Sequence, residues 1–483
     1  MEMLMQRRDF FRRMLTAGAG LVPFTVWGFP VRAYGRTSDI GILSAAADAP
    51  PTDRVLVMVQ LQGGNDGLNT LIPYADDAYY KARPTLGIPR TDLLPISGTL
   101  GLHPSLAPLK PLYEEGRMAI IQGVGYANPD RSHFRSTDIW LTGSNADEYL
   151  STGWLGRYLD YQFPNFHDDK ESDPLAIHIS PVLSLALQGK SGGTGIALQD
   201  PVQFFNLVSR GNQIIDTGAP PTPAGYELKF VREINAESLQ YSKQVKAAAD
   251  RGKNVVTYPS GSLAGQLALV ARLIAGGLGT RIYIVSQGGY DTHATQPTRH
   301  GQLLDELAKD IAAFEGDLQK LGVSNRVVGM TISEFGRRVK ENGSQGTDHG
   351  TSAPLFVFGD PVRGGVLGSN PDFGKLDGAG DFVYTYDFRQ VYASLLQQWF
   401  EAPSDGLKAV FPKGMTLLPL VQLAQGADLA GDFDNSGAVD FDDFFAFAQA
   451  FGTTNPTFDM DRSGKVDFND FFTFANNFGR RRK

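Results

Sequence analysis

The sequence predicts an α/β fold, a doubly wound and mostly parallel sheet, joined to a small all-α unit. Apolar runs of strand length alternate with helical patterns between residues 54 and 424, the order that repeated β–α units produce. Two acidic loops, 27 residues apart and each followed by a helical aromatic stripe, lie within residues 431–479. A chain of 483 residues is long enough to form both units.

The composition excludes several kinds of site. No cysteine is present, so disulfides, thiolate nucleophiles, iron–sulfur clusters and cysteine zinc sites are ruled out. The 44 basic and 52 acidic side chains give a net charge of −8, which argues against a nucleic-acid partner. Only 7 histidines occur, so the places where they cluster are informative.

Residues 1–36 are interpreted as an export signal. The pair Arg7-Arg8 precedes an apolar stretch over residues 14–29 that is short and interrupted by glycine and proline, unlike a membrane span. The paired arginines resemble a twin-arginine (Tat) signal, and an amphipathic N-terminal helix is the alternative. We expect Tat export to the periplasm, the cell surface or the extracellular space, a flexible leader at residues 37–53, and no transmembrane span in the mature protein.

Five strands and five helices are expected in the large domain, residues 54–424. Residues 55–61 form an uninterrupted apolar run, as in the buried strands of parallel sheets. Residues 425–430 are interpreted as a linker. The expected strands are residues 55–61, 118–123, 281–286, 326–332 and 355–359, and the expected helices are residues 105–115, 242–250, 263–276, 301–321 and 386–399.

Polar side chains follow the expected strands at the edge where open α/β sheets bind their ligands. Imidazoles and carboxylates at such an edge suit Zn²⁺, Mn²⁺ or iron. A single aspartate or histidine could simply cap a helix, but several clusters together predict a shared polar site. The clusters are Asn65-Asp66 and residues 128–134 (NPDRSHF), 288–293 (GGYDTH), 333–337 (SEFGR) and 346–350 (GTDHG).

The two acidic loops have the spacing of EF-hand-type calcium loops. Alternate oxygen ligands and a central glycine suit Ca²⁺, and the seventh position offers its backbone carbonyl. The expected calcium ligands are Asp432, Asp434, Ser436, Ala438, Asp440 and Asp443 in the first loop, and Asp459, Asp461, Ser463, Lys465, Asp467 and Asp470 in the second.

Aspartate rather than glutamate at the last loop position, with one helix after each loop, resembles the dockerin variety. This resemblance implies docking to a cohesin-like or cell-surface protein. The phenylalanines of the two helices are expected to form the core of this small domain, residues 431–479, and contact with a partner is the alternative. Residues 480–483 are expected to be a solvated basic tail.

Several long motifs carry a further resemblance. VQLQGGNDGLNTLIPY, PDRSHFRSTDIW, GGYDTHATQ, TISEFGRRVKENGSQGTDHG and APLFVFGDPVRGG, within residues 53–420, resemble the family catalogued as domain of unknown function 1501. Its members are exported bacterial proteins allied to the alkaline phosphatase and sulfatase superfamily. The resemblance implies that fold and metal-dependent hydrolysis of phosphate or sulfate esters, with one or two ions such as Zn²⁺ or Mn²⁺. Because cysteine is absent, a formylglycine made from cysteine is excluded.

The resemblance also implies metal ligands. The superfamily pattern Asp-x-x-x-His is shortened here to Asp291-x-His293, which leaves His300 as a substitute for His293. Phe335 stands where the superfamily commonly has histidine. Asp348 is either a ligand or a partner that orients its neighbouring histidine. The implied metal ligands are Asp66, Asp291, His293, Glu334, Asp348 and His349.

A catalytic role is implied for residues 131–133 and for a second arginine. Ser132 corresponds to the nucleophile, His133 to a proton donor, and Arg131 and Arg337 to clamps on the substrate oxygens. The alternative is that Ser132 and His133 only cap a helix over residues 134–141. Two functions therefore remain, an exported ester hydrolase with a docking tail and a non-catalytic binding or scaffold protein on the same fold.

Overall fold

The computed structural model of the chain describes residues 53–164, 166, 173–190, 192–210 and 240–422. It also describes residues 431–480 except 435, 437, 454, 456–457, 459 and 461–464, and the backbone of residues 24–26 and 29–31. The rest of the expected signal segment, nearly all of the leader and the linker lie outside the described residues. The chain divides into two compact units, Asp53–Gln422 and a second formed by Met1–Thr52 with Leu423–Lys483.

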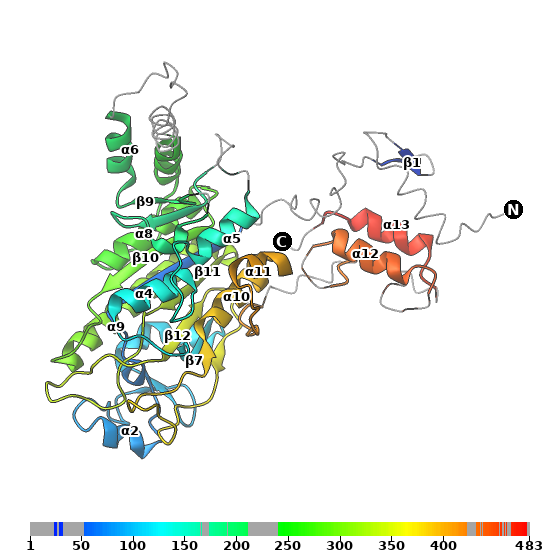
Figure 1. The fold of residues 1–483 in the computed structure, drawn as a ribbon. Helices are drawn as coiled ribbons and strands as arrows, with labels where there is room; N and C mark the ends of the chain where they lie inside the picture. Colours follow the sequence, from blue (N-terminus) through cyan, green and yellow to red (C-terminus); the bar gives the residue numbers. More distant parts are fainter. Residues whose placement is uncertain are drawn as a thin grey trace. The chain divides into compact units, whose positions relative to one another are not determined.

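A nine-stranded sheet lies at the centre of the large unit (Figure 1). Among its described strands only β12 runs antiparallel to its neighbours, so the predicted α/β fold with a mostly parallel sheet is confirmed. The order is β13 (Gly365–Leu367), β7 (Met118–Gly125), β12 (Ala353–Phe358), β11 (Val327–Ile332), β3 (Val55–Gln62), β10 (Ile282–Gly288), β8 (Ala176–Ile179) and β9 (Ile196–Leu198), with β14 (Tyr386–Asp387) also paired to β7.

The middle of the sheet is apolar on both faces. β3 is buried from Val55 to Leu61 and pairs in register with β10 on one side and β11 on the other. In β11, Gly329 lies against the ring of Phe358 in β12, and a Cβ there would stand 2.1 Å from a ring carbon. Glycine at this position therefore lets the antiparallel strand pack closely.

Helices cover both faces of the sheet. α8 (Ser262–Ala275) and α9 (Gln296–Lys320) share one apolar core with alternate side chains of β3, including Val57. In Figure 1 these helices lie on one side of the strands, and α10 (Phe388–Gln398) and α11 (Ser404–Val410) lie on the other. Tyr392 of α10 stacks on Trp154 of α5 (Trp154–Gln162), with ring centroids 4.1 Å apart.

Proline and capping residues set the helix ends that the apolar pattern misplaces. The helix expected at residues 105–115 is a 3-10 helix, η3 (Pro104–Leu109), followed by the short α3 (Lys110–Glu114). Prolines at positions 108 and 111 interrupt it because proline has no amide hydrogen to donate. α10 begins two residues later than expected, because Asp387 and Gln390 form a capping box in front of it.

Shorter elements surround this core. β4 (Leu71–Ile72), β6 (Gly101–Leu102) and β5 (Leu94–Pro95) form a small antiparallel sheet. No described helix combines the length and the apolar character needed to cross a bilayer. The remaining elements of this unit are η2 (Gly67–Asn69), α2 (Asp77–Ala82), α4 (His133–Thr142), η5 (Leu185–Leu187), α6 (Pro201–Arg210), a helix over residues 240–251, and η6 (Ser324–Arg326).

The described residues of the second unit form two helices and a short hairpin. The helices are α12 (Phe441–Ala450) and α13 (Phe468–Asn477), and the hairpin pairs β1 (Phe24–Val26) with β2 (Phe29–Val31). Phe447 and Phe474, one from each helix, are both 1% exposed and stack with centroids 5.6 Å apart. The aromatic stripes thus supply the core between the two helices.

The 27-residue repeat is also visible in the backbone of the second unit. Val439 in the first loop exchanges hydrogen bonds with Gly479 and the Arg480 carbonyl, after the second helix. In the same way Val466 in the second loop exchanges hydrogen bonds with residues 452 and 453, after the first helix. Each loop is therefore closed by the segment that follows the other helix. Arg480, expected in the solvated tail, belongs to the unit through its backbone.

Candidate metal centre

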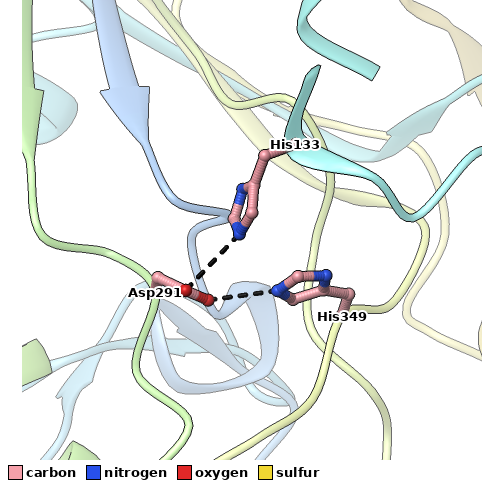
Figure 2. Close-up of side chains that lie close together, drawn as sticks. All are labelled: His133, Asp291 and His349. Carbon is pink, nitrogen blue, oxygen red and sulfur yellow. Dashed lines mark hydrogen bonds and ion pairs between the residues drawn. The ribbon is translucent and has the colours of Figure 1, made fainter. Parts of the chain in front are cut away.

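Three segments that lie far apart in the sequence bring metal-type side chains together (Figure 2). His133 is the first residue of α4, Asp291 follows β10, and His349 precedes β12. A nitrogen of each histidine and a carboxylate oxygen of Asp291 all lie within 4.8 Å of one another. The fold thus gathers these groups at the edge of the sheet where β7 and β10 end and β12 begins, a place where such a sheet can hold a ligand.

Asp291 is the hub of this cluster. Its Oδ1 lies 3.1 Å from His349 Nε2 and 3.0 Å from His293 Nε2, and its Oδ2 lies 3.4 Å from His133 Nε2. Burial would raise the pKa of Asp291, but hydrogen bonds from Arg337 and His349 outweigh it and lower the pKa to about 2. The carboxylate is therefore ionised at neutral pH and available to a cation.

The spacing of these atoms suits a small ion. An ion held tetrahedrally at about 2 Å keeps its ligand atoms about 3.3 Å apart. The separations from Asp291 to the three imidazole nitrogens are 3.0 to 3.4 Å, and the Nε2 atoms of His293 and His349 are 3.0 Å apart. His133, Asp291 and His349 therefore fit a single transition metal with nitrogen and oxygen ligands, and His293 lies beside Asp291 and His349.

Each imidazole is held by an acceptor at its other nitrogen. Nδ1 of His133 lies 2.9 Å from Glu334 Oε1, and Nδ1 of His293 lies 3.1 Å from Asp348 Oδ1. Nδ1 of His349 lies 2.8 Å from the Arg131 carbonyl. Because a carbonyl oxygen only accepts, His349 carries a proton on Nδ1, and a metal ion at Nε2 would take the place of the proton that Nε2 shares with Asp291. Outer acceptors of this kind orient metal-binding histidines.

These contacts change the roles expected for two residues. Asp348 orients His293 rather than His349. Glu334 is buried, and its Oε1 accepts hydrogen bonds from His133 and from the Gly63 amide, 2.8 Å away, so it supports a ligand instead of facing the cluster with both oxygens.

Two buried polar atoms beside the cluster have no hydrogen-bond partner among the described residues. They are Oε2 of Glu334 and Nε2 of His133. Phe335 packs its ring against His133 and His349, with centroids 5.0 and 4.6 Å away. An aromatic side chain thus lies where the resemblance leads us to expect a further imidazole. An imidazole nitrogen that makes no hydrogen bond but lies 3.4 Å from Asp291 Oδ2 is consistent with a cation bound between the two.

Asp66 does not join the cluster, contrary to expectation. It is 1% exposed, and both of its carboxylate oxygens bond Arg83, at 2.6 and 3.1 Å. Burial raises the pKa of Asp66, but the charge and hydrogen bonds of Arg83 outweigh it and the net pKa is lowered. An aspartate neutralised by an internal arginine is a structural ion pair, not a free metal ligand.

His300 does not replace His293 in the cluster either. It is buried beside the Asp66–Arg83 pair, with Nε2 3.0 Å from Asn65 Oδ1. Burial lowers the pKa of His300 to about 3, so the ring stays neutral in this polar network.

The two arginines expected to clamp a substrate are engaged elsewhere. All three nitrogens of the buried Arg337 donate to the chain, among them to the Gly64 and Thr347 carbonyls at 2.8 Å and to Asp291. Arg131 pairs with Asp377 and Asp381 at 3.1 and 2.7 Å. Both side chains therefore hold loops together around the cluster.

The hydroxyl of Ser132 makes no hydrogen bond within the part of the chain that the structure describes. The residue occupies the N-cap position of α4 and is exposed, but its hydroxyl makes no capping hydrogen bond. Its amide donates to Asp130 Oδ1 at 2.7 Å. The alternative that Ser132 acts as a side-chain helix cap therefore has no support in the geometry.

Comparison with known proteins gives a partial family match. A family model described as a protein of unknown function (DUF1501) matches residues 223–398, a segment that includes Asp291, His293, Glu334 and His349. No curated protein matches the chain.

Solved structures of two kinds are similar to the chain. An alkaline phosphatase from the Antarctic bacterium TAB5 is 10% identical, with 65% of this chain and 94% of that one covered and a TM-score of 0.25. A mutant of the TAB5 enzyme with magnesium bound is 9% identical over 64% and 92% of the two chains, with a TM-score of 0.28. A sulfatase from Pseudoalteromonas sp. is 13% identical over 76% and 71%, with a TM-score of 0.31. Similarities this weak carry no argument about activity.

The first acidic loop of the second unit holds another set of carboxylates. Oxygens of Asp432, Asp434 and Asp443 lie within 4.8 Å of one another. Asp443 accepts hydrogen bonds from the amides of Phe433 at 2.6 Å and Asp440 at 3.0 Å. Burial raises the pKa of Asp443 to about 6, and the charge of Asp434 adds to the effect.

The second loop repeats this arrangement as far as it is described. Asp470 accepts hydrogen bonds from the amides of Met460 at 2.7 Å and Asp467 at 2.8 Å, the counterparts of Phe433 and Asp440. The expected ligands Asp459, Asp461 and Ser463 lie outside the described residues. Ser436 and Ala438 of the first loop lie close together, with Ser436 Oγ 3.2 Å from the Ala438 carbonyl.

Proposed function

We propose that the large unit is a metal-dependent hydrolase of phosphate or sulfate esters. It would hold one ion such as Zn²⁺ or Mn²⁺ at Asp291, His133 and His349, with His293 beside them. The observation that carries the proposal is the convergence of three imidazoles on one ionised carboxylate, each fixed from behind by an acceptor. Nitrogen and oxygen ligands in this arrangement suit such ions.

The side chains around the cluster define the expected chemistry. A bound ion would polarise an ester oxygen or acidify a water molecule. Ser132 offers an exposed hydroxyl for attack on phosphorus or sulfur, next in the chain to His133. The N-terminus of α4 favours the negative charge of the ester group. Glu334 and the Arg131 carbonyl keep two of the imidazoles in place.

The test combines metal analysis with a panel of chromogenic phosphate and sulfate esters. We expect one transition-metal ion per chain and turnover of at least one ester, with turnover lowered by about 10³-fold in Asp291→Ala and His349→Ala. Ser132→Ala distinguishes a serine nucleophile, whose loss would lower turnover similarly, from a metal-bound water. Protein without metal, or turnover that survives both ligand substitutions, would contradict the proposal.

A second candidate is a non-catalytic binding or scaffold protein on the same fold. It is favoured by the engagement of Arg131 and Arg337, which leaves no free arginine from the expected pair to stabilise substrate charge. Stoichiometric metal with no turnover on any ester would decide for this candidate. In that case ligand substitutions would change stability alone.

We further propose that family membership extends over residues 53–420 and that the chain is exported by the Tat route. The motifs quoted above and the paired arginines at positions 7 and 8 support these proposals. Replacing both arginines by lysine should leave the protein in the cytoplasm, as cell fractionation would show. Export that persists without them would contradict the Tat route.

We propose that the second unit binds Ca²⁺ in both loops and docks the protein to a cohesin-like or cell-surface partner. The support is the carboxylate group of the first loop and the matching hydrogen bonds of Asp443 and Asp470. A titration with Ca²⁺ should saturate at two ions per chain. The absence of Ca²⁺ binding, or an unchanged number of bound ions in Asp443→Ala, would contradict this proposal.

A further inference from the structure

A cavity of about 300 Å³ opens in the large unit, separate from the cluster of histidines. Its walls come from η2, β7, the start of β12 and the segment over residues 369–385. The volume is at the lower end of the range for small-molecule sites, about 300–1,000 Å³. The cavity therefore suits a ligand of about the size of a single ring.

The walls of the cavity are fixed by contacts on both sides. Arg131 pairs with Asp377 and Asp381 and so ties the segment 369–385 to the loop before α4. The Thr385 amide donates to the Gly123 carbonyl at 2.7 Å. Gly123 has a φ of +60°, and a Cβ there would stand 2.8 Å from Thr385 Oγ1. A wall held in this way is largely pre-formed.

Neutral polar groups face the cavity without partners. Gln122 and Ser352 line it and are 4% and 9% exposed. Within the described part of the chain, the Gln122 carbonyl oxygen and the Ser352 hydroxyl make no hydrogen bond. Tyr384 adds a further hydroxyl from the segment 369–385, also without a described partner. These atoms are not closed off from solvent, so each can bond a water molecule in the cavity, and a ligand with several hydroxyl groups could replace those bonds.

Apolar groups make up the other part of the lining. Leu68, Leu71, Pro354 and Phe382 supply carbon surface beside these polar groups. A ligand with hydroxyls at its edge and C–H groups on its faces would satisfy both kinds of wall. A sugar ring has this character.

The charges around the cavity argue against an anion. Arg337 lines it, but its guanidinium is buried and donates to four carbonyls and Asp291. The only other cation in the lining, Lys375, is 84% exposed at its side chain and pairs with Asp372 at 3.7 Å. The described lining of the cavity therefore offers no buried, unpaired positive charge to a phosphate or sulfate group.

We propose that this cavity, with Gln122, Ser352 and Tyr384 as its hydrogen-bonding groups, binds a neutral sugar unit. Binding needs no metal and does not rest on hydrolysis at the histidine cluster. The ligand is held by hydrogen bonds to its hydroxyls and by packing of its ring against Phe382 and Pro354.

The test is saturation-transfer NMR on the full chain with methyl glycosides of glucose, galactose, mannose, fucose and xylose. We expect transfer to at least one glycoside, with affinity lowered about tenfold in Gln122→Leu and in Tyr384→Phe, each of which removes hydrogen bonds to the ligand. Lys375→Met and His349→Ala should bind as the unaltered chain does. The His349 variant separates this proposal from the hydrolase proposal, because it removes a ligand of the proposed metal centre and no group that lines the cavity.

Three outcomes would overturn the proposal. They are no transfer to any glycoside, transfer unchanged in both Gln122→Leu and Tyr384→Phe, and displacement of the glycoside by inorganic sulfate in a way that Lys375→Met abolishes. If Gln122→Leu does not fold, Tyr384→Phe decides, because it removes only one hydroxyl at the cavity.

Discussion

Single residues around Asp291 determine what the large unit can bind. Its carboxylate meets three imidazoles and Arg337, and hydrogen bonds from Arg337 and His349 help to keep its pKa at about 2. The imidazoles are oriented by Glu334, Asp348 and a main-chain carbonyl. The ligand set and its supports therefore form one connected network, in which a change at a support should act through the ligand it holds.

We predict that Glu334→Gln weakens metal binding by about 10–100-fold without unfolding the protein. The neutral amide holds His133 less firmly than the buried carboxylate does. Metal affinity measured by competition with a chelator checks this. Asp348→Asn is the matched control: Asp348 is 53% exposed at its side chain, so we expect a smaller loss. Unchanged affinity in Glu334→Gln would contradict the role given to this residue.

Asp66→Ala should lower the free energy of unfolding by about 3–5 kcal/mol, because it leaves Arg83 buried without its partner. Metal stoichiometry of the folded protein should not change. Denaturant unfolding and elemental analysis give the two readings. The double variant Asp66→Ala, Arg83→Met should recover part of the lost stability. Loss of the metal with the free energy of unfolding unchanged would contradict this prediction and show that Asp66 is a metal ligand.

The sequence could indicate the polar clusters but not which of their residues come together in the metal centre. Asp66 and Asp291 both follow strands, and nothing in either motif shows that Arg83, from the end of α2, reaches one of them. His133 lies beside Ser132 in the chain, and its place in the cluster depends on the direction of α4. Partners contributed by distant segments were therefore beyond sequence reasoning.

Among the elements, the strands were the most predictable. The apolar run at residues 55–61 corresponds to β3, but an apolar run carries no direction, so the antiparallel course of β12 could not be foreseen. Helix ends depend on single residues such as Asp387, which caps α10. The 27-residue repeat indicated that the two acidic loops are equivalent. It did not indicate that each loop exchanges backbone hydrogen bonds with the segment after the other helix.

The first acidic loop should respond to pH when calcium is removed. The pKa of Asp443 is raised from 3.8 to about 6, first by burial. A carboxyl with a raised pKa stabilises the folded unit fully only below its ordinary value, and the contribution is lost as the pH rises through about 6. In chelator, the opening free energy of the α12 amides, measured by hydrogen exchange, should fall as the pH rises through this window.

Calcium should restore that protection at neutral pH, because a bound cation favours the ionised carboxylate. Asp443→Asn removes the titrating group and should make the opening free energy independent of pH in chelator. Protection of α12 that does not change across this window in the unaltered, calcium-free chain would contradict the prediction.

At the scale of the whole molecule, the chain separates into two units with separate cores. The histidine cluster and the cavity both belong to Asp53–Gln422. The carboxylates of the acidic loops belong to the other unit. This division was visible in the sequence as a change from β–α alternation to an aromatic repeat.

Removal of residues 423–483 should leave metal binding at the histidine cluster and any ester turnover of the large unit within about twofold of the full chain, because no residue of that cluster lies in the deleted segment. The same deletion should release the protein from its location if the second unit docks it. Metal analysis, the ester panel and cell fractionation give the three readings. A shortened chain that folds but binds no metal would contradict the separation of roles.

The most direct test of the metal centre is X-ray diffraction from metal-loaded crystals, with anomalous data collected at the absorption edge of the metal. We predict one anomalous peak in the large unit, about 2 Å from Asp291 and from Nε2 of His133 and His349, and absent in His349→Ala. A peak bound by Asp66, or no peak in metal-loaded protein, would contradict the account.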